Sequence, residues 1–315
     1  MDRQKMLGGI LGVAVGDALG VPAEFRTRDQ LKVSPVDKML GYGTHHQPQG
    51  AWSDDSSLTF CLAESLCNGF ELCNIGHLLV KWLDEGYWTP YGKVFDYGNT
   101  TYQAISKLRA GVNPIEAGGT GERSNGNGSL MRILPVALYF ANSETEKMVD
   151  ATHRVSCLTH AHPRSQMACG FYNLMVTELL RETSPLESYF RAVDHAADIY
   201  SDLPFSEELD HFDRLFGKRI HEETEDAIQS SGYVIHTLEA SIWSFLRTPN
   251  FAEAVLSAVN LGDDTDTTGA VTGGLAGVHY GLEAIPDEWI DTLARRSDIL
   301  ELGETLYCAV LLDEG

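Results

Sequence analysis

Apolar residues recur every three or four positions along almost the whole chain, while strict alternation of apolar and polar residues is nearly absent. The clearest examples are residues 78–83, 172–180 and 234–245. A period near 3.6 is typical of helices with one buried face, whereas a period of two indicates strands. We therefore expect an all-α protein, built as a compact orthogonal bundle of about a dozen helices.

Turn signals divide this pattern into helix-sized segments. Clusters rich in glycine, proline, asparagine and threonine fall at residues 68–69, 89–92, 118–128, 183–185 and 248–250. Pro249 stands just before the next apolar segment, as expected at the start of a helix. No low-complexity tract or linker interrupts the chain, so we predict that residues 1–315 form a single domain.

Two segments carry glycine at every fourth position, namely Gly8, Gly12, Gly16 and Gly20, and Gly269, Gly273, Gly277 and Gly281. Each glycine inside a helix costs roughly 0.5–1 kcal/mol relative to alanine, so the repeat needs a reason. Residues four apart share one helix face, and each helix would offer a smooth groove to another backbone. If these two helices pack together, Asp17 and Glu24 come close to the acidic residues 263–267. Close packing without functional meaning is the alternative.

Charge and cysteine content limit the possible partners and location. With 45 acidic and 23 basic residues the formal net charge is −22, which opposes binding to nucleic acid or anionic lipid. The six cysteines form no CxxC pair and are expected to be reduced core residues of a cytoplasmic protein. The apolar N-terminal run resembles a signal peptide, but Asp17 interrupts it and no clear cleavage site follows. The most charged stretch, residues 206–226, is expected at the surface.

Two acidic clusters stand where helical patterns begin: Ser53-Asp54-Asp55-Ser56-Ser57 and Asp263-Asp264-Thr265-Asp266-Thr267. Capping of backbone amides explains one or two of these side chains, but not five carboxylates. Repulsion among confined carboxylates is relieved by protonation or by a bound cation. The candidate ligands are all hard oxygens, which favours Mg²⁺, Mn²⁺ or Ca²⁺ over Zn²⁺. Shared ligands would suit two ions roughly 3.5–4 Å apart.

An EF-hand calcium loop is the competing interpretation of the second cluster. Residues 264–269 match the first half of such a loop, including the glycine at its sixth position. The twelfth position is Leu275, where a bidentate glutamate is required. The glycine-patterned helix also begins inside the presumed loop, so we expect a metal site of a different kind.

Seven segments resemble, in order, the ADP-ribosylglycohydrolase family, the group that includes the dinitrogenase reductase-activating glycohydrolase. They are GGILGVAVGDALGVPAEF (8–25), WSDDSS (52–57), FDYGNTT (95–101), GNGSLMRILP (126–135), LTHAHP (158–163), SGYVIHTLEA (231–240) and LGDDTDTTGA (261–270). The resemblance implies an all-α fold around a central dinuclear metal site that holds two Mg²⁺ or Mn²⁺ ions. It also implies a hydrolase that releases ADP-ribose from a modified protein side chain or a small ADP-ribosylated molecule.

The resemblance further implies roles for individual residues. The implied metal ligands are Ser53, Asp54, Asp55, Asp264, Asp266 and Thr267, and Asp263 is expected to be a neighbouring group. The implied catalytic residues are Asp55, Glu24 as a general acid/base or a gate, and Asp96 facing the departing guanidinium of arginine-directed members. The implied substrate contacts are Asn127, Gly128, Ser129, His162, Gly232 and Tyr233, with the glycine-rich residues 118–129 suited to a diphosphate. Arg132 is expected to be a structural ion-pair partner.

Other functions and other ADP-ribosyl linkages also fit the sequence. Ser53 and Ser56 stand where family members more often carry threonine, although a hydroxyl ligand is retained. A catalytically silent, crystallin-type relative that binds ADP-ribose or has a structural role would release no ADP-ribose. A two-metal phosphohydrolase would release inorganic phosphate instead. Asp96 favours an arginine linkage, but serine-linked and other ADP-ribosyl groups also fit.

Overall fold

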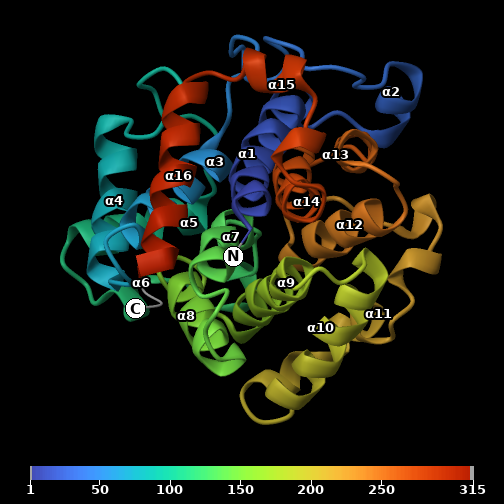
Figure 1. The fold of residues 1–315 in the computed structure, drawn as a ribbon. Coiled ribbons are helices and arrows are strands. Elements are labelled where there is room, and N and C mark those ends of the chain that lie inside the picture. Colours follow the sequence, from blue (N-terminus) through green and yellow to red (C-terminus); the bar gives the residue numbers. More distant parts are fainter. Residues whose placement is uncertain (1, 313–315) are drawn as a thin grey trace.

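The computed structural model describes residues 2–312, which form 16 α-helices and seven 3₁₀-helices without a β-strand (Figure 1). The first eight helices are α1 (Arg3–Gly20), α2 (Arg28–Val33), α3 (Asp54–Leu66), α4 (Leu72–Glu85), α5 (Asn99–Arg109), α6 (Pro114–Ala117), α7 (Leu134–Tyr139) and α8 (Thr145–Cys157). The second eight are α9 (Pro163–Leu180), α10 (Pro185–Ile199), α11 (Asp213–Phe216), α12 (Val234–Leu246), α13 (Phe251–Val259), α14 (Thr265–Tyr280), α15 (Asp287–Thr292) and α16 (Arg296–Leu312). The 3₁₀-helices are η1 (Val21–Ala23), η2 (Glu122–Ser124), η3 (Leu130–Arg132), η4 (Phe205–Phe212), η5 (Ile220–Glu222), η6 (Glu225–Ala227) and η7 (Leu282–Ala284).

The all-α prediction is therefore confirmed, and the helix number exceeds the expected dozen because several helices are only one turn long. Helix ends fall where the sequence supplies capping groups. Asn250, directly after Pro249, accepts a hydrogen bond from the Glu253 amide at 2.9 Å and starts α13. Ser53 caps α3 in the same way through the amide of Asp55.

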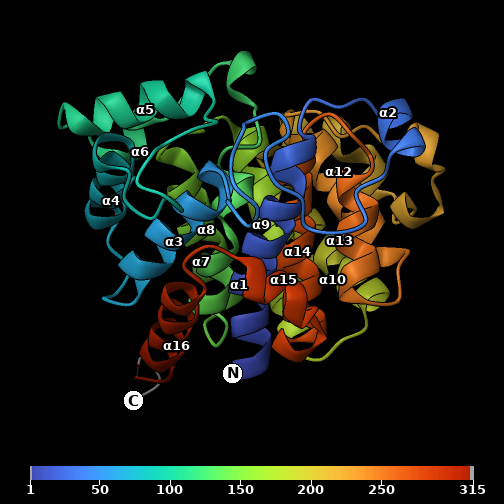
Figure 2. The same cartoon turned by 90° about the horizontal axis from the view of Figure 1, so that it is seen from above.

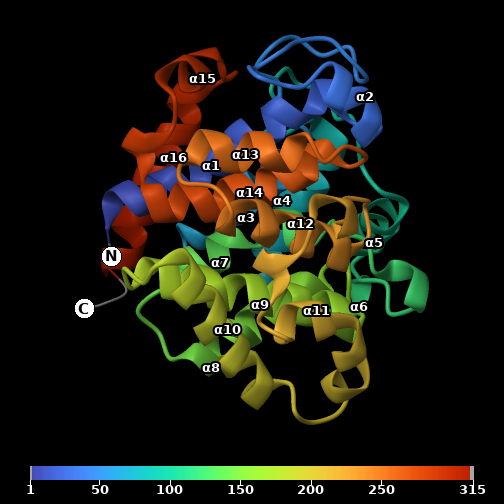
Figure 3. The same cartoon turned by 90° about the vertical axis from the view of Figure 1, so that its right-hand side faces the viewer.

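Helices α1 and α14 lie side by side at the centre of the molecule (Figures 1 and 3). Their glycines face each other: a Cβ on Gly12 would overlap the carbonyl of Gly273, and one on Gly16 would overlap the carbonyl of Gly269. The two backbones thus approach more closely than any larger residue allows. The predicted pairing of the glycine-patterned helices is confirmed, except that Gly281 ends α14 with a positive φ of 81°.

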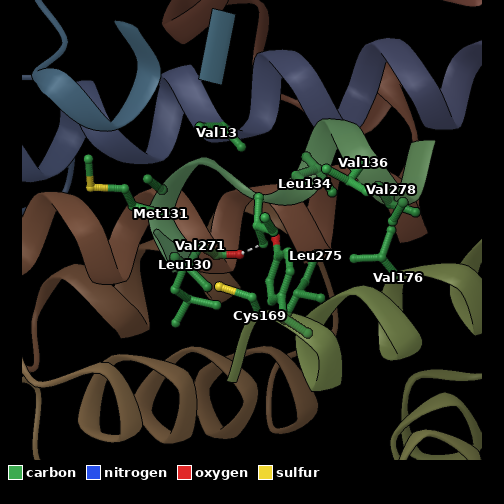
Figure 4. Close-up of a cluster of buried hydrophobic side chains, with 14 of the residues drawn as sticks. Val13, Leu130, Met131, Leu134, Val136, Cys169, Val176, Val271, Leu275 and Val278 are labelled. Atoms are coloured by element: carbon green, nitrogen blue, oxygen red, sulfur yellow. Dashed lines mark hydrogen bonds between the residues drawn. The ribbon is translucent and has the colours of Figure 1, made fainter. Parts of the chain in front are cut away.

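Helix α9 packs against this central pair through an apolar layer (Figure 4). Side chains from α1, η3, α7, α9 and α14 meet there, among them Val13, Leu134 and Leu275. Within the layer, the hydroxyl of Tyr172 in α9 donates a hydrogen bond to the carbonyl of Val271 at 3.1 Å, which satisfies a buried polar group. The layer fixes α14, and with it the acidic residues at its start, relative to the rest of the bundle.

The apolar character of α1 is explained by its central position. Residues 3–23 are long and apolar enough to cross a membrane by composition, but their most apolar window is entirely buried inside the protein. The six cysteines form no disulfide; Cys61 and Cys169 are buried, whereas Cys73 and Cys308 are exposed, so not all are core residues as expected.

Two irregular regions border the bundle. The connection between α2 and α3 crosses the same side of the molecule as α5 (Figure 2). The charged residues 206–226 form η4, α11, η5 and part of η6, and Phe212, Leu215 and Ile220 anchor them to the core. The predicted surface location is correct for most charged side chains of this stretch, but Glu208 is only 14% exposed.

Candidate functional site

A polar cavity of about 280 Å³ opens where the two acidic clusters and the glycine-rich loop meet. Its lining comes from the end of η1, the start of α3, residues 96–101, the loop before η3 and the start of α14. Eight of the residues predicted from the sequence line it, namely Glu24, Asp54, Asp96, Asn127, Gly128, Gly232, Asp264 and Thr267. Segments far apart in the sequence therefore converge on one cavity.

The first acidic cluster begins α3 and is buried. The hydroxyl of Ser53 lies 2.9 Å from one oxygen of Asp55, whose side chain is 1% exposed. Asp17 of α1 accepts hydrogen bonds from the Ser53 amide at 2.9 Å and from the Ser56 hydroxyl at 2.6 Å. Ser56 is thus engaged with Asp17, which anchors the start of α3 to α1.

The second acidic cluster begins α14 and contacts the first. The Thr267 hydroxyl lies 3.3 Å from the same Asp55 oxygen that contacts Ser53. One carboxylate oxygen each from Asp17, Asp55 and Asp266 lies within 4.8 Å of the other two. The predicted proximity of Asp17 to the acidic stretch is confirmed, and the two clusters form one buried group of carboxylates.

Electrostatics in this group are suited to a cation. Asp55 Oδ1, Asp264 Oδ1 and Asp266 Oδ2 are buried and have no hydrogen-bond partner among the described residues. Burial, followed by repulsion from neighbouring carboxylates, raises the pKa of Asp54, Asp55 and Asp266 well above the usual value. A bound cation would satisfy the unpaired oxygens and offset the repulsion. Since the group contains only oxygen ligands, the donor set fits a hard divalent cation.

Glu24 and Asp96 form one wall of the cavity, and His45 lies between them. The His45 imidazole makes a short hydrogen bond to Glu24, and its Nε2 lies 3.9 Å from Asp96 Oδ2. Burial raises the pKa of Glu24 to about 8, with the charge of Asp96 adding to it and the His45 hydrogen bond opposing it. The hydrogen bond to Glu24 raises the pKa of His45. His45 was missed in the sequence because its loop, residues 34–53, carries no periodic pattern.

The glycine-rich loop forms another part of the cavity lining. Asn127 donates hydrogen bonds from its side chain to Asp264 and to Thr237, both at 2.9 Å, and its amide bonds the Gly232 carbonyl. A Cβ on Gly232 would lie 3.1 Å from an Asp264 carboxylate oxygen, so the chain is close-packed here. The loop, residue 232 and the second acidic cluster are thus connected through Asn127.

Arg164, at the start of α9, links the loop to other segments and was not singled out in the sequence. It is 4% exposed and forms ion pairs with Glu122 at 2.6 Å and Glu208 at 2.7 Å. Its guanidinium also donates a hydrogen bond to the Tyr233 hydroxyl at 3.2 Å. His162 caps α9, and its Nε2 lies 3.5 Å from a Glu122 carboxylate oxygen. Tyr233 and His162 therefore lie beside the loop without lining the cavity.

Three further residues differ from, or refine, the expectations. The Ser129 hydroxyl is fully buried, accepts a hydrogen bond from Ser156 at 3.0 Å and does not line the cavity. Arg132 is buried and structural, but it donates hydrogen bonds to carbonyl groups and to the Thr159 hydroxyl, so the expected ion pair is wrong for the described residues. Asp263 is exposed in a left-handed turn with a φ of 59°, outside the cavity lining.

Comparisons with known proteins identify the family of the chain. The model of a family described as ADP-ribosylglycohydrolase matches residues 1–313. A solved structure titled "ADP-ribosylglycohydrolase-related protein complex" superposes with a TM-score of 0.82 and 32% sequence identity, covering 98% of both chains.

Two curated proteins are similar in sequence over most of the chain. ADP-ribosylarginine hydrolase Tri1 of Serratia proteamaculans (strain 568) is 34% identical over 310 residues, which cover 98% of this chain and 79% of that protein. ADP-ribosyl-[dinitrogen reductase] glycohydrolase of Rhodospirillum rubrum is 30% identical over 298 residues, covering 92% and 90% respectively. The resemblance drawn from the seven sequence segments is confirmed.

Proposed function

Because the chain belongs to the ADP-ribosylglycohydrolase family, a family of hydrolases, we propose that it releases ADP-ribose from modified arginine side chains. The observation that carries this proposal is the cavity itself. Asp54 and Asp264 line one polar space of about 280 Å³ together with Asn127 and Gly128 of the glycine-rich loop, and Asp264 has an unpaired buried oxygen. The similarity to proteins named ADP-ribosylarginine hydrolase and ADP-ribosyl-[dinitrogen reductase] glycohydrolase supports the arginine linkage.

Two divalent cations, Mg²⁺ or Mn²⁺, are the proposed cofactors. The residues that would hold them are Ser53, Asp54, Asp55, Asp264, Asp266 and Thr267, which lie at the starts of α3 and α14. When bound, such cations supply positive charge that polarises ribose hydroxyls and lowers the pKa of water at the site. Asp17 holds the first cluster in place through Ser53 and Ser56 rather than acting on substrate.

Glu24 and Asp96 are the proposed catalytic side chains at the bond that breaks, together with Asp55. Hydrolysis adds the hydroxyl of water to the ribose anomeric carbon and a proton to the departing nitrogen, which regenerates arginine. Glu24 lines the cavity and hydrogen-bonds His45, so it is placed to move that proton. Asp96, on the same wall, would face the positively charged guanidinium and stabilise it before departure.

The ADP-ribose would bind along the glycine-rich loop. Gly128, Gly232 and Asn127 line the cavity and are the proposed direct contacts. Ser129, His162 and Tyr233 lie behind or beside them, so we assign these three the role of holding the loop in its binding conformation. This refines the substrate-binding set expected from the sequence.

The proposed partners are ADP-ribosylated proteins, with small ADP-ribosylated molecules as the second candidate. The net charge of −22 supports a protein that binds neither nucleic acid nor anionic membranes. The six free cysteines support the proposed cytoplasmic location. A single domain over residues 1–315 is part of the same proposal.

Release of free ADP-ribose from arginine-modified and serine-modified peptides tests the function, with Mg²⁺ or Mn²⁺ and with chelator. We expect metal-dependent release from the arginine-modified peptide and slower or no release from the serine-modified one. Faster release from the serine-modified peptide would reject the linkage. Bound metal without release from either peptide would point to a silent relative that only binds ADP-ribose.

A further inference from the structure

Tyr97 lies next to the cavity wall that Glu24 and Asp96 form. It follows Asp96 in the chain, lines the cavity and is nevertheless 44% exposed. Asp96 has a positive φ of 48°, a left-handed conformation that is uncommon for a residue other than glycine. Asp96 and Tyr97 thus line the cavity from neighbouring positions.

The Tyr97 ring is held in place from two sides. Trp82, which is 1% exposed in α4, meets it edge-on with ring centroids 6.0 Å apart and an interplanar angle of 88°. Tyr102 of α5 stacks against it at 6.0 Å and 24°. Tyr102 is itself 45% exposed, so the pair presents aromatic surface to solvent, and Tyr97 is the member that lines the cavity. A fixed, exposed aromatic pair at a cavity is typical of a binding surface.

The charges nearby indicate what this surface binds. Asp96 and Glu24 place two acidic groups on the adjoining wall, with His45 between them. A diphosphate would be repelled by these acids, and it fits the amides of the glycine-rich loop elsewhere in the lining. A cation would be attracted to the acidic wall, and a flat cation would also gain from the aromatic ring. The guanidinium group is flat, always charged and stacks on aromatic rings.

We propose that Tyr97, supported by Tyr102, is the platform on which the guanidinium of the acceptor arginine stacks while Asp96 faces its charge. The inference rests on the proposed function and adds the residue that makes the site selective for an arginine linkage. Tyr97 would contact only the leaving-group side of the bond. Binding of ADP-ribose itself would not depend on it.

The test combines turnover and binding in the metal-loaded enzyme. Hydrolysis of ADP-ribosyl-arginine gives kcat/KM, and titration with free ADP-ribose gives Kd. The variants are Tyr97→Leu, which removes the ring, and Tyr97→Phe, which keeps it. Tyr91→Leu is the matched control, because Tyr91 is a 54% exposed tyrosine of the same connection that does not line the cavity.

For Tyr97→Leu we expect kcat/KM to fall about twofold to thirtyfold, which corresponds to the loss of a cation–π interaction worth about 0.5–2 kcal/mol. The Kd for ADP-ribose should stay unchanged. Tyr97→Phe and Tyr91→Leu should retain the wild-type kcat/KM. An equal loss of ADP-ribose affinity in Tyr97→Leu would place the ring against the nucleotide and overturn the inference. An unchanged kcat/KM would overturn it too. A wild-type enzyme without turnover would instead reject the proposed function.

Discussion

Gly20, the last residue of α1, lies directly against Asp266 of α14, and a methyl group on Gly20 would overlap the Asp266 Cα. The close packing of the two glycine-patterned helices therefore continues into the carboxylate cluster. The repeat brings α1, which carries Asp17, against the start of α14, which carries Asp266.

Alanine at Gly16 or Gly20 should destabilise the protein and impair the site. A Cβ at either position would overlap the backbone of the partner helix, so α1 and α14 must separate. We expect a loss of about 1–3 kcal/mol in the free energy of unfolding, as for other overpacked cores. Urea denaturation measures it. Gly121→Ala is the control, because Gly121 has a φ of −83° and open space around its Cβ position. Equal stability of Gly20→Ala and Gly121→Ala would contradict the packing argument.

Much of this arrangement could be predicted from the sequence, because helical period, caps and glycine spacing are local signals. The start of α13 at Asn250 and the pairing of α1 with α14 are examples. The contribution of His45 could not be predicted, since an irregular loop carries it to Glu24. Arg164 was missed because its partners, Glu122 and Glu208, lie more than 40 positions away and carry no motif.

Metal binding should raise the melting temperature of the wild-type protein. A cation would pair the unsatisfied oxygens of Asp55 and Asp266 in the folded state only. At a concentration of 100 times Kd, this linkage stabilises the fold by about 2.7 kcal/mol. Thermal denaturation with Mg²⁺ or Mn²⁺ and with chelator measures the shift.

Two asparagine variants decide whether the effect belongs to the cluster. Asp55→Asn should lose most of the metal-induced shift. Asp263→Asn should keep it, because Asp263 is exposed and asparagine tolerates its left-handed turn. Loss of the shift in Asp263→Asn, with retention in Asp55→Asn, would reverse the ligand assignment.

Arg164→Met should weaken substrate binding more than it slows turnover. Without the guanidinium, Glu122, Glu208 and Tyr233 lose their common partner, and the glycine-rich loop becomes less well held. We expect KM to rise about tenfold, equivalent to about 1.4 kcal/mol, with kcat changed less. Arg181→Met is the comparison, since Arg181 pairs with Glu178 at the far end of α9. A similar KM in both variants would show that the loop does not depend on Arg164.

Glu239 should make stability depend on pH. Burial in α12 raises its pKa to about 7, although Arg214 opposes the shift. Between the ordinary glutamate pKa of about 4.5 and pH 7, the folded protein keeps a proton on Glu239 that the unfolded chain releases. The free energy of unfolding therefore falls as the pH rises through this range. Glu239→Gln removes the titrating group. Its free energy of unfolding, relative to that of the wild type, should therefore rise by up to about 3 kcal/mol between pH 4.5 and pH 8.

Denaturation at both pH values, with Glu288→Gln on the exposed face of α15 as control, measures this gain. A stability difference between wild type and Glu239→Gln that stays constant with pH would contradict the assignment.

Metal-dependent hydrolysis is proposed to depend on the buried carboxylates at the starts of α3 and α14. The most direct test measures kcat for ADP-ribose release from an arginine-modified peptide at saturating Mg²⁺ or Mn²⁺. It compares wild type with Asp54→Asn, Asp264→Asn and Asp263→Asn. We predict that the first two variants lose turnover while keeping their helical circular dichroism, and that Asp263→Asn keeps it. Wild-type turnover in Asp54→Asn and Asp264→Asn would contradict the account.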